Sequence, residues 1–192
     1  MPKLGMEPIR RAALVKATIA EVGDVGSLQV TVGQIAKRAG MSSALAHHYF
    51  GGKDQIFLAA MRHILSEFKA EVLAELARLE PHAAPERRAE AIIRACFAQS
   101  CFSPRAISAW MTFYVMAQTN PEALRLWRLY QCRLRSNLCH ALRPVVAEPK
   151  AAASVLSALI DGLYLRAALN DPEAGEVATQ RALVVLRLLR DG

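Results

Sequence analysis

Apolar residues recur every three or four positions along almost the whole chain, which is the spacing of one face of an α-helix. Glycine and proline interrupt this pattern at regular intervals and mark where one helix ends and the next begins. We predict an all-α protein with nine helices, over residues 9–22, 32–39, 43–50, 53–79, 85–102, 104–119, 121–142, 149–169 and 175–190. Gly23 is expected to end the first helix. Residues 27–32 alternate like a strand, but the chain offers no second strand to pair with them, so we expect a loop.

Two short helices joined by a glycine form the first motif, between Thr31 and Lys53. Thr31 and Gln34 match a capping box at the start of the first helix, and Ser42 is the expected N-cap of the second. A tight turn at Gly40 between two such helices is typical of a helix-turn-helix. The small core predicted between them consists of Ile35, Ala36, Ala39, Leu45 and Phe50.

The second short helix has side chains that suit DNA. Its first residues would reach base edges in the major groove, where the Ser43 hydroxyl donates or accepts and the Ala44 methyl contacts thymine. Hydroxyl, imidazole and ammonium groups around it suit phosphate oxygens. Phosphate contacts are predicted for Thr31, His47, Tyr49 and Lys53, and Ser42 and His48 complete the DNA-facing set. On shape alone, an ordinary helical hairpin with a polar surface explains the same pattern.

The net charge of +7 is concentrated at the start of the chain. The first 53 residues hold seven Lys or Arg against three Asp or Glu, whereas the other 139 residues hold 17 against 14. A basic first segment on a nearly balanced body indicates a polyanionic partner. By charge alone, nucleic acid and a membrane surface both fit.

The run TVGQIAKRAGMSSALAHHYFGGK resembles the DNA-binding domain of TetR-family repressors, most characteristically in Tyr49-Phe50 followed by Lys53. The resemblance implies a basic arm and DNA-binding domain over residues 1–53, and a helical ligand-binding and dimerisation domain over residues 54–192. It also implies a homodimer that binds a palindromic operator, with one helix-turn-helix for each half-site. Gly51-Gly52 departs from the family pattern, in which polar residues are commoner just before the lysine.

The opening MPKLGMEPIRR and the late segment ALIDGLYLRAAL are similar to the BetI-type branch of that family. Repressors of this branch control genes for choline uptake and for the oxidation of choline to glycine betaine, and choline relieves the repression. The resemblance therefore implies a cytoplasmic, choline-responsive repressor. A TetR-type repressor that responds to another quaternary or lipophilic cation is the alternative.

Aromatic residues are only 6% of the chain, yet both tryptophans and three of the four tyrosines lie between residues 110 and 164. Ring faces bind a quaternary ammonium ion, because its nitrogen cannot donate a hydrogen bond. Asp161 would add a counter-charge or pair with an arginine such as Arg166, and a plain aromatic core is the alternative for the rings. The predicted ligand-binding residues are Trp110, Phe113, Tyr114, Trp127, Tyr130, Asp161 and Tyr164.

Small residues along helix 149–169 would allow a second helix to approach closely. In helix 175–190, a similar stripe consists of Ala178, Ala182, Val185 and Leu189. We expect these last two helices to form a four-helix interface between two chains, with packing inside one chain as the alternative.

Other classes of protein fit the sequence poorly. It has no phosphate-binding glycine loop, G-x-S-x-G motif, paired carboxylates or metal-ligand spacing, so we expect no catalytic residue, metal or cofactor. The longest uncharged stretch near the middle has 16 residues, whereas a membrane span needs about 18–20, so we expect no span. The charged N-terminus does not fit a signal peptide. Reduced cytoplasmic thiols are expected at Cys96, Cys101, Cys132 and Cys139.

Overall fold

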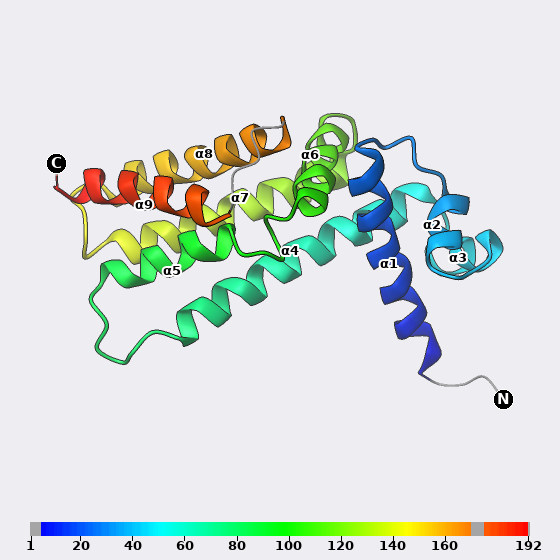
Figure 1. Cartoon of the computed structure of the whole chain (residues 1–192), viewed down its shortest axis with the longest axis horizontal. Coiled ribbons are helices and arrows are strands. Elements are labelled where there is room, and N and C mark those ends of the chain that lie inside the picture. The colour runs from blue at the N-terminus through cyan, green and yellow to red at the C-terminus, as the bar shows by residue number, and fades with distance from the viewer. Residues whose placement is uncertain (1–4, 170–174, 192) are drawn as a thin grey trace. The chain divides into compact units, whose positions relative to one another are not determined.

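The computed structural model describes residues 5–169 and 175–191, which contain nine helices and no strand, so the predicted all-α class is confirmed. The first four residues of the expected basic arm lie outside this part of the chain. The loop predicted at residues 27–32 is confirmed up to residue 31, and Val32 is the first residue of α2. The helices are α1 (Met6–Val25), α2 (Val32–Arg38), α3 (Ser43–Phe50), α4 (Lys53–Ala77), α5 (Glu86–Cys96), α6 (Pro104–Thr119), α7 (Pro121–Leu142), α8 (Pro149–Ala168) and α9 (Gly175–Asp191) (Figure 1).

The chain forms two compact units. The first unit comprises the described residues up to Ile64 together with Pro104–Leu126, and the second comprises Leu65–Ser103 and the described chain from Trp127 onward. α6 therefore groups with α1, α2 and α3 in the first unit, and α5, α8 and α9 group in the second. The functional division after residue 53 stays a prediction.

In the first unit, Gly23 does not end the first helix, so that prediction was wrong. α1 continues to Val25, and Gly26 ends it in the left-handed conformation (φ 65°) while donating its N–H to the Val22 carbonyl at 2.8 Å. Gly23 instead lies where α1 packs against α6, and a Cβ atom there would lie 2.4 Å from the Arg105 carbonyl oxygen. The absence of a side chain at Gly23 allows this close contact.

In the second unit, α8 lies beside α9, and α9 also packs against α5 (Figure 1). The helix expected to run to residue 102 ends at Cys96, because Phe97 leaves the helical conformation with φ −111° and ψ 12°. The Tyr164 hydroxyl, from α8, donates to the Cys96 carbonyl oxygen at 2.6 Å and lies 3.3 Å from that of Cys101. A distant side chain thus satisfies the carbonyl at this helix end.

By length and mean hydropathy alone, α8 is the one helix in the described chain that could cross a membrane. The uncharged stretch at residues 106–121 does not meet this criterion. The α8 side chains Leu156, Ile160 and Leu163 are buried within the second unit. α8 also contains the buried Ser157 and the hydrogen-bonded Tyr164. These contacts make α8 an integral helix of the folded unit.

Candidate DNA-binding and ligand-binding sites

Both predicted caps of the helix-turn-helix are confirmed. At the start of α2, the Thr31 hydroxyl oxygen accepts from the Gln34 N–H at 3.2 Å. The Gln34 amide oxygen in turn accepts from the Thr31 N–H at 2.7 Å and from its hydroxyl at 2.8 Å. At the start of α3, the Ser42 hydroxyl accepts from the Leu45 N–H at 3.2 Å. Gly40, with φ 67°, makes the turn between the two helices.

The core between α2 and α3 is partly as predicted. Ile35 and Ala36 are fully buried, but Ala39, Leu45 and Phe50 are only half-buried. Ala46 and Tyr49 supply the missing buried surface, because they lie on the inner face of α3.

Most of the predicted DNA-facing side chains lie at the surface. Lys53 is half-buried, with its ammonium 5.4 Å from the Phe57 ring centroid. Tyr49 is buried, and its hydroxyl accepts from an Arg10 guanidinium N–H at 3.3 Å, so its side chain has a structural role within the unit. The exposed members are Thr31, Ser42, Ser43, Ala44, His47 and His48. A DNA contact by any of these eight residues stays a prediction.

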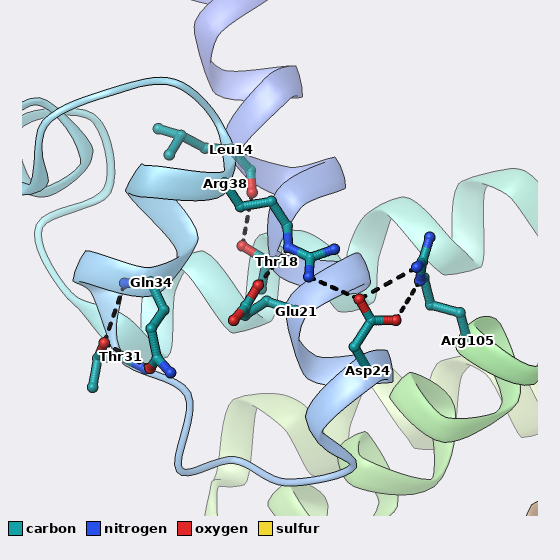
Figure 2. A network of polar contacts seen from close by, with 8 residues as sticks. All are labelled: Leu14, Thr18, Glu21, Asp24, Thr31, Gln34, Arg38 and Arg105. Atoms are coloured by element: carbon teal, nitrogen blue, oxygen red, sulfur yellow. Dashed lines mark hydrogen bonds and ion pairs between the residues drawn. The ribbon is translucent and has the colours of Figure 1, made fainter.

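An ion-pair network centred on Asp24 joins three helices of the first unit (Figure 2). Arg105 of α6 binds the Asp24 carboxylate through two guanidinium nitrogens, at 2.7 and 3.3 Å. Arg38 of α2 binds the same carboxylate at 2.8 Å and also pairs with Glu21. Asp24 in α1 therefore connects the helix-turn-helix to α6.

The network also fixes the charge of its central residue. The hydrogen bond from Arg105, and then that from Arg38, hold the pKa of the Asp24 carboxyl below its usual range, and partial desolvation opposes them. Asp24 is thus ionised at neutral pH. Sequence reasoning did not find this network, because Asp24 and Arg105 are 81 positions apart and no local pattern relates them.

Three of the predicted ligand-binding residues lie on α6 in the first unit. Trp110 and Tyr114 form an edge-to-face pair, with ring centroids 5.5 Å apart and an interplanar angle of 67°. Phe113 is fully buried. These rings lie on the same helix as Arg105, the α6 member of the Asp24 network.

The other four lie in the second unit. Tyr130 packs edge-to-face against Phe68, with centroids 5.4 Å apart, and Trp127 is half-buried on the same helix. Tyr164 packs against Phe102, and Asp161 accepts a hydrogen bond from the Gln131 amide at 2.7 Å. The seven residues are therefore divided between the units, and their ligand-binding role stays a prediction.

All four cysteines are free thiols. Cys96 and Cys101 are buried and Cys132 is exposed. Burial raises the pKa of the Cys96 thiol well above its usual range and that of Cys101 to about 11. These two thiols are therefore protonated and unreactive core groups at neutral pH.

Comparison with known proteins matches both parts of the chain. Residues 14–60 match the family described as "Bacterial regulatory proteins, tetR family", and residues 85–189 match "BetI-type transcriptional repressor, C-terminal". The HTH-type transcriptional regulator BetI of Brucella anthropi is 48% identical over 96% of this chain and 94% of its own length. The protein of the same name from Agrobacterium fabrum is 44% identical over 96% of this chain and 88% of its own length.

Solved structures share the fold. A transcriptional regulator from Rhodococcus sp. Rha1 superposes with a TM-score of 0.82, at 23% identity, over 93% of this chain and 95% of that one. A protein from Saccharomonospora viridis, described as a regulator and solved in complex with choline, superposes with a TM-score of 0.81 at 20% identity. The match covers 92% of this chain and 95% of that one. At these identities, the likeness establishes the fold alone.

The helix-turn-helix and the helical fold around it define a DNA-binding transcriptional regulator, and the chain belongs to the TetR family. Its relatives are regulators and not enzymes. Within the family it is of the BetI type, as its C-terminal helices and its relatives indicate. α8 is accordingly a helix of a DNA-binding regulator and not a membrane span.

Proposed function

We propose that this chain is a cytoplasmic, homodimeric repressor of genes that convert choline to glycine betaine, and that choline relieves the repression. The observation that carries the proposal is its likeness to regulators named BetI over 96% of its length. The choline complex of the Saccharomonospora viridis protein, which has the same fold, adds support for the ligand.

In this proposal α3 enters the major groove, with Ser43 and Ala44 at base edges. Thr31, His47 and Lys53 bind phosphates and fix the position of the protein along the duplex. The exposure of Ser43, Ala44 and His47 is consistent with these roles.

Choline would bind against aromatic ring faces, because its charge lies inside a methyl shell and attracts the electron-rich face of Trp or Tyr. The pair of Trp110 and Tyr114 on α6 offers such rings. A small shift of α6 would reach α2 through Arg105, Asp24 and Arg38, which are joined by hydrogen bonds of 2.7–3.3 Å. Choline then changes operator affinity only as far as it prefers one arrangement of these helices over the other.

The dimer would form through α8 and α9, which carry an exposed apolar face. Leu165 on α8 and Leu188 on α9 are 52% and 68% exposed, and a Cβ added at Gly162 would have no neighbour within 4 Å. Ala178 and Ala182, which the sequence analysis considered for this interface, are fully buried inside the chain instead. Joining two copies of the exposed face would form an isologous four-helix contact.

The test is a titration of the purified protein onto DNA from upstream of its own gene, at fixed salt, with and without choline. We expect specific binding that choline weakens or remodels, and that glycine betaine and an inert salt leave unchanged. Specific binding that ignores choline would discard the choline assignment while the DNA-binding role stands. A panel of lipophilic quaternary cations would then test the other effector class.

A further inference from the structure

A cavity of about 380 Å³ lies in the second unit, among α4, α5 and α7. This volume falls within the range of about 300–1,000 Å³ that is typical of small-molecule sites. Of the seven residues predicted to bind choline, Tyr130 is the single one that lines it. The cavity is therefore distinct from the aromatic residues of α6 and needs its own interpretation.

One wall of the cavity is apolar and largely buried. Val72 of α4 and Ile92 of α5 are 5% and 3% exposed, so the chain holds both side chains firmly. Phe68 and Tyr130 line the same wall and fix each other by their edge-to-face contact. This wall offers a hydrocarbon chain an apolar surface.

The polar part of the lining is cationic. Lys69, Arg88 and Arg133 supply three positive charges, and His140 and Asn137 add hydrogen-bonding groups. None of the described residues that line the cavity is an Asp or Glu. Within the described chain, no carboxylate forms an ion pair with Lys69, Arg88 or Arg133. The field in the cavity therefore attracts an anion and repels a quaternary ammonium ion.

A second pocket adjoins the cationic part of this lining. It shares Arg88, His140 and Ala141 with the first cavity and adds Arg143, together with one acid, Glu80. The guanidinium groups suit an oxyanion in particular, because their paired N–H donors match the two oxygens of a carboxylate.

We propose that the cavity among α4, α5 and α7 binds a small amphipathic anion, with its hydrocarbon tail against Phe68, Val72 and Ile92 and its carboxylate at Arg88 and Arg133. This site would give the regulator a second class of ligand, opposite in charge to choline. It depends on the lining of this cavity and not on the choline proposal.

The test is isothermal titration of the full-length protein with sodium decanoate below its micelle concentration. Decyl glucoside, which has a similar tail with an uncharged head, and inorganic phosphate, which has no tail, are titrated in parallel. We expect decanoate to bind saturably at one site per chain, and the other two probes to bind much more weakly. Equal binding of the uncharged amphiphile, equal binding of phosphate, or no binding of decanoate would each overturn the proposal.

Variants locate the site. The double variant R88Q/R133Q should weaken decanoate binding by about tenfold or more, since it removes charge-assisted hydrogen bonds. The matched control R128Q changes an exposed arginine of α7 outside the lining and should bind like the parent. Leu73→Glu should also weaken decanoate binding, because it places a negative charge in the cavity lining. It carries little risk to folding, since Leu73 is 57% exposed. Unchanged affinity in both the double variant and Leu73→Glu would overturn the assignment.

Discussion

Lys53 is the residue at which the proposed DNA interface can be tested through a single charge. Its side chain is half-buried at the start of α4, directly after the helix-turn-helix. We expect Lys53→Ala to weaken binding to every DNA sequence and to lower the slope of log affinity against log salt by about one. Lys16→Ala, an exposed change on α1, is the control and should keep the parental slope. A parental slope in Lys53→Ala would remove Lys53 from the DNA contacts.

Asp24 is the residue on which the link between α2 and α6 depends. We expect Asp24→Asn to reduce the ratio between operator affinities measured without and with choline, because both arginines lose their shared anion. Glu75→Gln, which removes a surface ion pair with Arg78, is the control. An unchanged choline ratio in Asp24→Asn would mean that the signal takes another route.

Asp24 should also make the stability of the fold depend on pH. The pKa of the Asp24 carboxyl is lowered in the folded protein, so its ion pairs stabilise the fold above the ordinary aspartate value of about 3.9. That contribution is lost as the pH falls through the lowered pKa. Thermal unfolding of the parent and of Asp24→Asn should therefore differ at neutral pH and converge in acid, and a constant difference would contradict this assignment.

At the scale of the element, the end of α5 depends on a side chain from α8. Tyr164→Phe keeps the ring but removes the hydroxyl that donates to the buried Cys96 carbonyl. We expect the free energy of unfolding to fall by about 1–3 kcal/mol, the usual cost of leaving a buried polar group unsatisfied. Chemical denaturation of the parent and of Tyr164→Phe measures this difference in the free energy of unfolding. Unchanged stability combined with a lost choline response would instead make Tyr164 a ligand contact.

The contact between α1 and α6 depends equally on one position. Gly23→Ala places a methyl group 2.4 Å from the Arg105 carbonyl oxygen, so the two helices must move apart. We expect a loss of about 1–3 kcal/mol in stability. Gly33→Ala is the control, because its nearest neighbour would be the Ser43 hydroxyl at 3.5 Å and the better helix propensity of alanine adds up to about 1 kcal/mol.

These elements also show what the sequence can predict. The bounds of α3 and the caps at Thr31 and Ser42 follow from residues within a few positions, and the structure confirms them. The predicted end of α1 was wrong because Gly23 lies at the close contact with Arg105 of α6, and Gly26 ends the helix instead. The predicted end of α5 was wrong too, and the carbonyl at its actual end is satisfied by the distant Tyr164.

The prediction of site residues also failed where a feature depends on residues that are distant in the sequence. The exposed surface of α3 follows from its helical spacing, but the burial of Tyr49 depends on its packing within the first unit and on Arg10 of α1. Likewise, the cationic cavity collects Lys69, Arg88 and Arg133 from three helices that no local pattern relates.

At the scale of the whole molecule, the proposed dimer depends on the exposed apolar face of α8 and α9. We expect Leu188→Glu to shift the protein from dimer to the 21.0 kDa single chain in sedimentation analysis, and to weaken operator binding with it. Val115→Glu, which changes another exposed apolar residue, on α6, is the control and should remain dimeric. A dimeric Leu188→Glu would place the interface elsewhere.

The capping box of α2 has a consequence for the encounter with DNA. In the free protein, the Thr31 N–H and hydroxyl both donate to the Gln34 amide oxygen. These are the donors that a phosphate oxygen would use at this position. If Thr31 binds a phosphate as proposed, that phosphate has to replace the Gln34 amide oxygen, a neutral acceptor that already satisfies both donors. Under this proposal, a phosphate that meets Thr31 in a non-specific encounter would gain little from the replacement. A phosphate held in place by a docked α3 would be the stronger, charged acceptor.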